Sequence, residues 1–294
     1  MPRTSAADAI EDPRLRHFDL EVDGGGDGVD VLPGSQECIE RGPRTVEEVF
    51  KLPHRMFREV LSEPSKRRVR KLLAKGVAVH SHYSGLDMPA IQLHRLAEVA
   101  GLPDAIKNLH CSDIAKSVQD LQGALPHDWR PQCCHGNLLE RLDPLLREQL
   151  EILRAVADGD LERDIDELKT GKGSLPTKAQ IAELSDKTGE RLVESLMELL
   201  AGYDFAGAPA LSYCYFHDKL CPTAADICCE GRVNISTGGS ECKDYSTFGQ
   251  QKGCFGKGIV AFMVWLFETK YRAPDFIVHE NVPRWKKKQK NTYT

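Results

Sequence analysis

The sequence predicts an α/β protein in which helices flank a mostly parallel β-sheet. Between residues 76 and 137, short β-prone runs alternate with segments of helical spacing, which is typical of βαβ units. The same alternation returns between residues 231 and 285. In the stretch between these two parts, leucines recur three and four residues apart, which indicates helices with one apolar face.

Length and composition are those of a globular chain. Its 294 residues suffice for one large domain or two small ones. No apolar run reaches the roughly 18 to 20 residues that cross a bilayer, and no apolar core follows Arg3, so we expect neither a membrane span nor a secretory signal. Ten cysteines in such a chain favour reduced thiols, a metal site or a catalytic thiol over a disulfide scaffold. These features predict an intracellular protein.

The net charge and the composition of the two chain ends indicate function less clearly. A net charge of −5 does not favour a dedicated nucleic-acid binder, whose phosphate contacts need clustered Lys and Arg. Two basic runs, 66–71 and 286–290, either contact phosphates, serve as a nuclear import signal, or are solvated surface. Residues 1–45, rich in Gly, Asp and Pro, are expected to be disordered. A helical lead-in follows over 46–75, with Thr45 as its N-cap.

The first α/β half, residues 76–137, places polar residues directly after its strands. The run 77–83 is a strand candidate that leads into Ser84 and Gly85. A second strand ends at Asp113, and a weaker third one precedes Gly136 and Asn137. Open parallel sheets bind ligands at the carboxyl ends of their strands, so we expect these loops to hold a ligand.

Residues 138–230 are predicted to be a helical insertion. The leucine stripes of this segment end at about residue 202, and the run 171–176 divides them, which indicates a helical hairpin. The stripes are expected to belong to the core. A groove for a partner protein is the alternative.

The second α/β half, residues 231–285, contains the loop with the clearest signal of a catalytic residue. A strand over 232–236 leads into the glycine-containing loop 237–246, in which Cys242 lies. Glycines allow a tight turn, and loop N–H groups can acidify an exposed thiol. A strongly apolar helix over 259–271 and a strand ending at Glu280 follow.

Together these segments resemble the DNA (cytosine-5)-methyltransferase family. Tyr83-Ser84-Gly85 is similar to the family's Phe-Ser-Gly cofactor motif, Asp113 to its ribose acid, and Gly136-Asn137 to its Gly-Asp pair near the adenine. The segment 238–246 resembles the Gly-Gly-Pro-Pro-Cys-Gln-x-Phe-Ser loop, and Glu280-Asn281-Val282 is identical to the Glu-Asn-Val motif. The resemblance spans residues 77–285, interrupted by the insertion, and Cys242 and Glu280 keep the family's order at a spacing of 38 residues.

The resemblance implies a Rossmann-like sheet of an S-adenosylmethionine-dependent methyltransferase that acts on DNA, with RNA less favoured, in the nucleus or otherwise the cytoplasm. It implies that the Cys242 thiolate adds to C6 of a flipped-out cytosine, that Glu280 contacts N3, and that Asn281 fixes the loop. The residues it implies for cofactor binding are Tyr83, Ser84, Gly85, Asp113, Asn137 and Gly239.

The chain departs from the family pattern at several positions. Glu241 and Lys243 flank the cysteine where the family has Pro and Gln, and Asn137 stands where an acid is expected. The loop after Gly85 lacks the later glycines. No Arg-x-Arg motif, target-recognition region or final cofactor motif follows Glu280, so we expect a sheet that is incomplete at its C-terminal side. Two alternatives stay open: a cytosine methyltransferase, or a non-catalytic binding or scaffolding protein that keeps the fold and engages partners through the insertion.

A second group of residues has the chemistry of zinc ligands. Cys214, His217, Cys221 and Cys228 offer enough soft donors for a tetrahedral ion, but their spacing fits no standard finger. Cysteine and histidine are also common in protein cores, so the expectation is no metal, with these four residues as weak candidates. The run 133–135 could join them only if the insertion folds back. A zinc-dependent interaction domain is therefore a third alternative.

Overall fold

The computed structural model describes residues 45–83, 85, 87–172, 175–205, 211–223, 231–239, 255–256 and 258–280. The described chain forms two compact units. The first comprises residues 45–78, 88–107 and 231–233, and the second comprises the rest. No helix in the described ranges combines the length and apolar character that crossing a membrane requires.

The first unit is built from helices that are capped by their own side chains. Its elements are α2 (Val46–Arg55), the π-helical turn η1 (Met56–Val60), α3 (Glu63–Ala74), α4 (Met88–Ala100) and the short turn η2 (Pro103–Ala105). Thr45 Oγ1 accepts a hydrogen bond from the Glu48 N–H at 3.1 Å, which confirms the predicted N-cap. Gln92 Nε2 donates to the Val49 carbonyl at 2.9 Å and joins α4 to α2.

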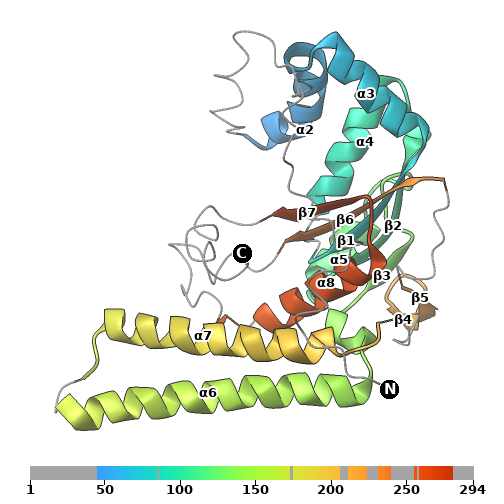
Figure 1. Ribbon diagram of the computed structural model, residues 1–294. Helices are drawn as coiled ribbons and strands as arrows, with labels where there is room; N and C mark the ends of the chain where they lie inside the picture. The colour runs from blue at the N-terminus through green and yellow to red at the C-terminus, as the bar shows by residue number, and fades with distance from the viewer. Residues whose placement is uncertain are drawn as a thin grey trace, which may run out of the picture. The chain divides into compact units, whose positions relative to one another are not determined.

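The sheet is mixed and has seven strands, in the order β5-β4-β3-β2-β1-β6-β7 (Figure 1). Pairs β2·β3 and β6·β7 are parallel, whereas β3·β4 and β4·β5 are antiparallel. The α/β architecture is therefore confirmed and is compatible with a Rossmann-like fold. The strands are β1 (Val77–His82), β2 (Ile106–Ser112), β3 (Cys133–His135), β4 (Leu211–Cys214), β5 (Lys219–Pro222), β6 (Val233–Gly239) and β7 (Phe276–Glu280).

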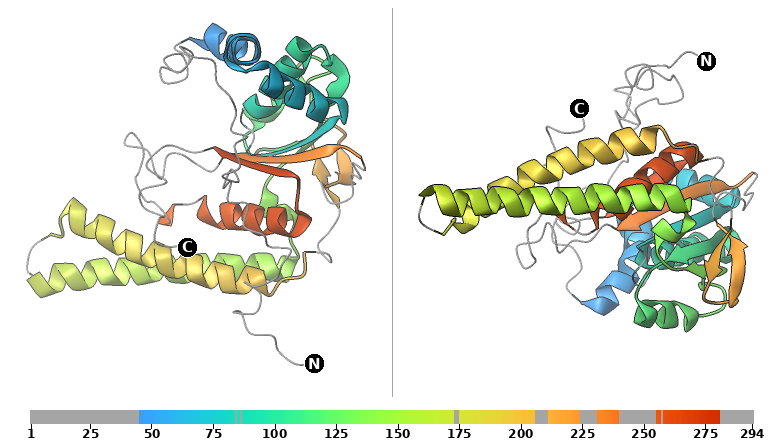
Figure 2. Two further views of the ribbon diagram at one scale, coloured as in Figure 1. Left: turned by 45° about the horizontal axis from the view of Figure 1, so that its top comes forward. Right: turned by 90° about the horizontal axis from the view of Figure 1, so that it is seen from below.

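In the second unit, helix α8 (Ile259–Arg272) lies between the sheet and a pair of long helices (Figures 1 and 2). The pair consists of α6 (Pro144–Lys172) and α7 (Lys178–Ala201), which run side by side. Buried leucines of α6 and α7 form one cluster with the apolar face of α8, including Trp265, which is 1% exposed. The shorter elements of this unit are α5 (Lys116–Gly123) and the turn η3 (Leu138–Arg141).

The segment predicted as a helical insertion is not helical throughout, which corrects that prediction. Its last part forms the β-hairpin β4–β5, which extends the sheet beyond β3. The inward positions of this hairpin are filled by Ser212, Cys214 and Cys221 in place of β-branched or aromatic residues. The alternating strand signal is consequently weak in the sequence.

The glycines before Cys242 also differ from the prediction, since Gly238 and Gly239 belong to β6 and not to a loop. They pair with His279 and Glu280 of β7. A Cβ atom on Gly238 would lie 2.7 Å from the Trp265 ring, and the φ angle of Gly238 is not positive. The absence of a side chain at Gly238 therefore serves close packing against α8 and not a tight turn.

Candidate functional site

The loops after β1 and β2 meet at the carboxyl ends of these strands. The Gly85 N–H donates to Asp113 Oδ2 at 3.0 Å, and the Ala115 N–H donates to Asp113 Oδ1 at 2.9 Å. Among the described residues, no atom lies within 4 Å of a Cβ built on Gly85. The glycine and the acid that the sequence singled out separately are thus in direct contact, with open space beside the glycine.

Two glutamines of α5 hold these loops. Gln119 Nε2 donates to the Asp113 carbonyl and Gln122 Nε2 to the Gly85 carbonyl, each at 2.8 Å. The Cys111 thiol of β2 donates in turn to Gln122 Oε1 at 2.7 Å. Neither glutamine was among the site residues predicted from the sequence. Their signal was a spacing of three residues on the helix that follows the acid, which places them on one face.

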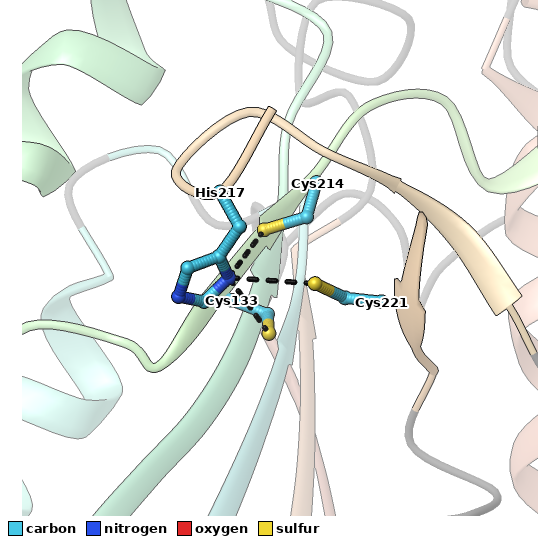
Figure 3. Close-up of side chains that lie close together, drawn as sticks. All are labelled: Cys133, Cys214, His217 and Cys221. Carbon is cyan, nitrogen blue, oxygen red and sulfur yellow. Dashed lines mark hydrogen bonds between the residues drawn. The ribbon is translucent and has the colours of Figure 1, made fainter. Parts of the chain in front are cut away.

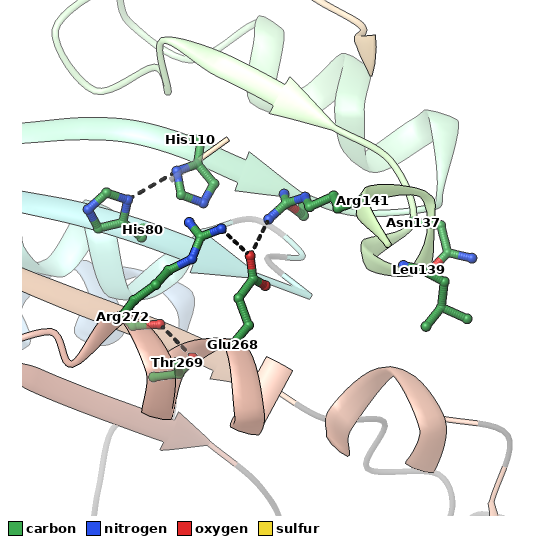
Figure 4. Close-up of polar contacts among 10 residues, drawn as sticks. His80, His110, Asn137, Leu139, Arg141, Glu268, Thr269 and Arg272 are labelled. Atoms are coloured by element: carbon green, nitrogen blue, oxygen red, sulfur yellow. Dashed lines mark hydrogen bonds and ion pairs between the residues drawn. The ribbon is translucent and has the colours of Figure 1, made fainter. Parts of the chain in front are cut away.

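The third strand ends beside the second. Ser112 and His135 are register partners, and the Asp113 N–H donates to the His135 carbonyl at 3.1 Å. Asn137, two residues on, caps η3 because its Oδ1 accepts the Leu139 N–H at 3.0 Å (Figure 4). Its side-chain oxygen keeps a second lone pair.

The ends of β6 and β7 lie at the same edge of the sheet. Thr237 Oγ1 donates to Ser81 Oγ of β1 at 3.1 Å, so the final residues of β6 lie beside those of β1. Gly239 is the register partner of Glu280 in the parallel pair β6·β7. Five strands, β3, β2, β1, β6 and β7, therefore end at one edge of the sheet, together with those predicted site residues that the structure describes.

Several predicted site residues lie outside the described residues. These are Ser84, Cys242, Asn281 and the weak metal candidate Cys228. The structure describes the backbone of Glu280 but not its side chain. The Tyr83 ring is half-buried and packs against the apolar cluster formed by α6, α7 and α8. Tyr83 has a φ of 54°, a left-handed conformation that begins the turn after β1.

Of the two basic runs, the structure describes one. Residues 66–71 belong to α3 in the first unit, where most of their side chains are exposed. Lys66 Nζ pairs with Glu63 at 2.9 Å, and Arg70 lies over the Phe57 ring. Residues 286–290 lie outside the described part of the chain.

A buried polar cluster lies on the sheet face covered by α8 (Figure 4). His80 Nδ1 and His110 Nδ1 are 3.1 Å apart, which requires one ring to donate and the other to accept. Glu268 of α8 lies 2.6 Å from Arg272 and 3.9 Å from Arg141. Arg141 Nη2 also donates to Ser112 Oγ, so the cluster reaches the end of β2 beside Asp113.

Burial keeps these histidines neutral. Desolvation lowers the pKa of His80 to about 4, and a hydrogen bond with the Asn234 side chain opposes that shift only in part. It lowers the pKa values of His82 and His110 well below the ordinary range, and Arg141 and the neighbouring rings lower them further. This group therefore consists of neutral imidazoles at neutral pH and supplies no cation to a ligand.

Four side chains on β3, on the hairpin β4–β5 and on its turn have the composition of a metal site (Figure 3). Cys133 of β3 joins Cys214, His217 and Cys221, and their ligand atoms all lie within 4.8 Å of one another. Hydrogen bonding with the Cys133 thiol lowers the pKa of Cys214 to about 4, and the same contact raises the pKa of Cys133. The structure thus brings together three of the four weak metal candidates and adds Cys133.

The first unit contains a cleft of about 370 Å³. Its lining comes from residues 73–76 and 101–105, which precede β1 and β2, together with Arg232, which precedes β6. It therefore lies at the amino ends of these strands, whereas the predicted site residues follow the carboxyl ends.

No family model, curated protein or solved structure matches this chain. Support for a function therefore comes from the edge of the sheet at which the carboxyl ends of β3, β2, β1, β6 and β7 lie, called the carboxyl edge below.

Proposed function

We propose that this chain is a cytosine-C5 methyltransferase-like protein that binds S-adenosylmethionine at the carboxyl edge of its sheet and acts on DNA. The contact between the Gly85 N–H and the Asp113 carboxylate carries the proposal. It joins the loop and the acid that the family resemblance assigns to the cofactor.

The residues present fit the cofactor. A carboxylate has about four lone-pair positions, and the loop N–H groups occupy two of those of Asp113, which leaves acceptors for two ribose hydroxyls. Space beside Gly85 accommodates a ligand against the backbone, as glycine loops in such folds do. Asn137 offers one remaining lone pair of its oxygen to an adenine amino group.

The proposed chemistry uses the ends of β6 and β7. S-adenosylmethionine supplies an electrophilic methyl group. The Cys242 thiolate adds to C6 of a flipped-out cytosine, Glu280 hydrogen-bonds N3, and C5 becomes the nucleophile. After methylation of C5, loss of the C5 proton restores the double bond and expels the Cys242 thiolate. The pairing of Gly239 with Glu280 supports this assignment, since it starts the cysteine loop beside the glutamate.

Covalent trapping tests the proposal. DNA that contains 5-fluorocytosine should form a stable adduct with the full chain in the presence of S-adenosylmethionine, because fluorine at C5 cannot leave as a proton does. Cys242→Ser should abolish the adduct. Cys254→Ser, a change of another thiol in the same segment, should preserve it. An adduct that persists in Cys242→Ser would show that the nucleophile is wrongly assigned.

The non-catalytic alternative is favoured by one observation on α6. Leu145, Ile152 and Val156 recur seven and four residues apart on the helix and are 70%, 53% and 56% exposed. An apolar stripe of this kind suits a partner protein. In this alternative, Glu280→Gln changes neither the fold nor the binding of a partner, and substitution of the stripe by serine abolishes that binding.

A further inference from the structure

We propose that Cys133, Cys214, His217 and Cys221 bind a structural zinc ion that fastens the β4–β5 hairpin to β3. Figure 3 shows the three sulfur atoms gathered around one nitrogen of His217. The ligands come from β3, from the end of β4, from the hairpin turn and from β5. This inference does not depend on the proposed enzymatic function.

The three sulfur–nitrogen distances are close to those of a tetrahedral zinc site, and all four donor atoms lie within 4.8 Å of one another. Zn–S bonds of about 2.3 Å and Zn–N bonds of about 2.05 Å at tetrahedral angles place sulfur and nitrogen roughly 3.6 Å apart. His217 Nδ1 lies 3.4 Å from Cys214 Sγ, 3.4 Å from Cys221 Sγ and 3.8 Å from Cys133 Sγ. The side chains are therefore arranged around a point that could be equidistant from all four donors.

Hydrogen bonding alone does not account for this arrangement. Nδ1 of a neutral imidazole carries either one proton or one lone pair, so it satisfies one sulfur well and not three. All three cysteines are free thiols and buried, with no disulfide to explain their proximity. An ion at the centre satisfies all four groups at once.

In the described part of the chain, backbone contacts also attach the hairpin to β3: the Tyr215 N–H donates to the Cys134 carbonyl at 2.8 Å, and the His135 ring lies 3.1 Å from the Tyr213 carbonyl. An isolated two-stranded hairpin is marginally stable in water, and β4 pairs with β3 at one register position, His135 with Cys214. The apolar cluster beneath the hairpin consists of the three cysteines, with Phe216 packed against them. Leu211 and Leu220 point away and are 47% and 62% exposed. A bound metal would supply the stability that such a small apolar contact does not.

The turn between the strands is shaped for a thiolate ligand. After the Cys133 thiol, the backbone N–H groups of Cys134, His217 and Phe216 lower the pKa of Cys214, an arrangement that favours a metal-bound thiolate. Asp218 adopts a left-handed conformation with a φ of 51°, and its carboxylate accepts the Tyr213 hydroxyl, which closes the turn. Four protein ligands leave no open position, so the ion would be structural and not catalytic. Three thiolates and an imidazole favour zinc over harder cations.

Metal analysis of the purified full chain tests the proposal. The chain should retain about one zinc per molecule through gel filtration, as closed Cys3His sites do. Cobalt substitution should give the intense visible bands of a tetrahedral site together with thiolate-to-cobalt charge transfer. A folded chain that holds less than a few tenths of a zinc and shows no tetrahedral cobalt spectrum would overturn the proposal.

Two cysteine variants identify the fourth ligand. Cys133→Ser should lose most of the zinc, whereas Cys228→Ser, the candidate that the local sequence alone suggests, should retain it. The opposite result would overturn the assignment of Cys133. Because Cys133→Ser could also unfold the hairpin, His217→Cys serves as a second variant. It keeps four soft donors and should retain zinc with a cobalt spectrum shifted toward four-sulfur coordination, and an unshifted spectrum would exclude His217 as a ligand.

Discussion

Two histidine rings, His80 of β1 and His110 of β2, meet within the buried polar cluster. Because His80 and His110 share one hydrogen bond between their Nδ1 atoms, protonation of both would set two donors against each other. His82, His135, Arg141 and Arg272 surround them, and Glu268 is the acid of this cluster. The charged form of His80 is thus disfavoured by burial first and by cations second.

We expect stability to fall as the pH decreases from about 6.5 to about 4. The pKa of His80 is lowered to about 4 in the folded chain, so the unfolded chain binds more protons in this window. The stabilisation that neutral His80 contributes is fully present above the pKa of histidine in the unfolded chain. It amounts to on the order of 3 kcal/mol for one such group. Urea unfolding at several pH values measures it. His80→Asn should reduce the pH dependence, and His127→Asn, at an exposed position, should not. An equal slope in His80→Asn would contradict the account.

The carboxylate of Glu268 lies between two buried or half-buried guanidinium groups, Arg141 and Arg272. Glu268→Gln should destabilise the fold by about 3 kcal/mol, because removal of one partner leaves a buried charge without compensation. Glu183→Gln on α7 is the matched control, since its pair with Lys187 is exposed on both sides. Comparable urea midpoints for the two variants would show that the buried pair does not stabilise the protein.

Among the elements, α8 and β6 depend on each other through one glycine. A methyl group at position 238 would lie 2.7 Å from two carbon atoms of Trp265, whose ring is enclosed and cannot move aside. Gly238→Ala should therefore cost about 1 to 3 kcal/mol. Gly159→Ala in α6 meets nothing within 4 Å and should instead stabilise the helix by roughly 0.5 to 1 kcal/mol. Thermal or urea unfolding compares them, and an unchanged midpoint in Gly238→Ala would place Trp265 elsewhere.

The elements that the sequence predicted correctly are those with strong periodic or apolar signals. The strands β1 and β2, the helix α8 and the long helices α6 and α7 have apolar faces that local spacing reveals. The hairpin β4–β5 was missed because its inward residues are a serine and two cysteines, which give no alternating apolar pattern. Gly238 was predicted to lie in a loop. From the sequence alone, a glycine that makes room for an aromatic ring cannot be distinguished from one that allows a tight turn.

The sequence predicted those site residues that lie directly after the end of a strand. Asp113 and Gly85 could be singled out from their positions after two strands, although their mutual hydrogen bond could not. Cys133 could not be joined to Cys214, because 81 residues separate them and only the pairing of β3 with β4 brings them together. Contacts of such long range depend on strand order, which local patterns do not determine.

At the scale of the whole molecule, the strand order places the cofactor residues and the zinc ligands at neighbouring positions of one sheet. Cys133 begins β3, and Gly136 and Asn137 follow its end. A Cβ atom on Gly136 would lie 3.0 Å from the Tyr215 hydroxyl oxygen, so the hairpin turn packs closely over the start of the loop. The hairpin that the metal is proposed to hold therefore forms one side of the proposed cofactor edge.

Calorimetric titration of the folded full chain with S-adenosylhomocysteine tests the central claim most directly. We predict a micromolar dissociation constant and at least about a tenfold loss of affinity in Asp113→Ala, as expected for a hydrogen-bonded carboxylate. Asp128→Ala, at an exposed position, should leave the affinity unchanged. An absence of binding in a sample whose circular dichroism shows the folded α/β structure would contradict the account and favour the non-catalytic alternative.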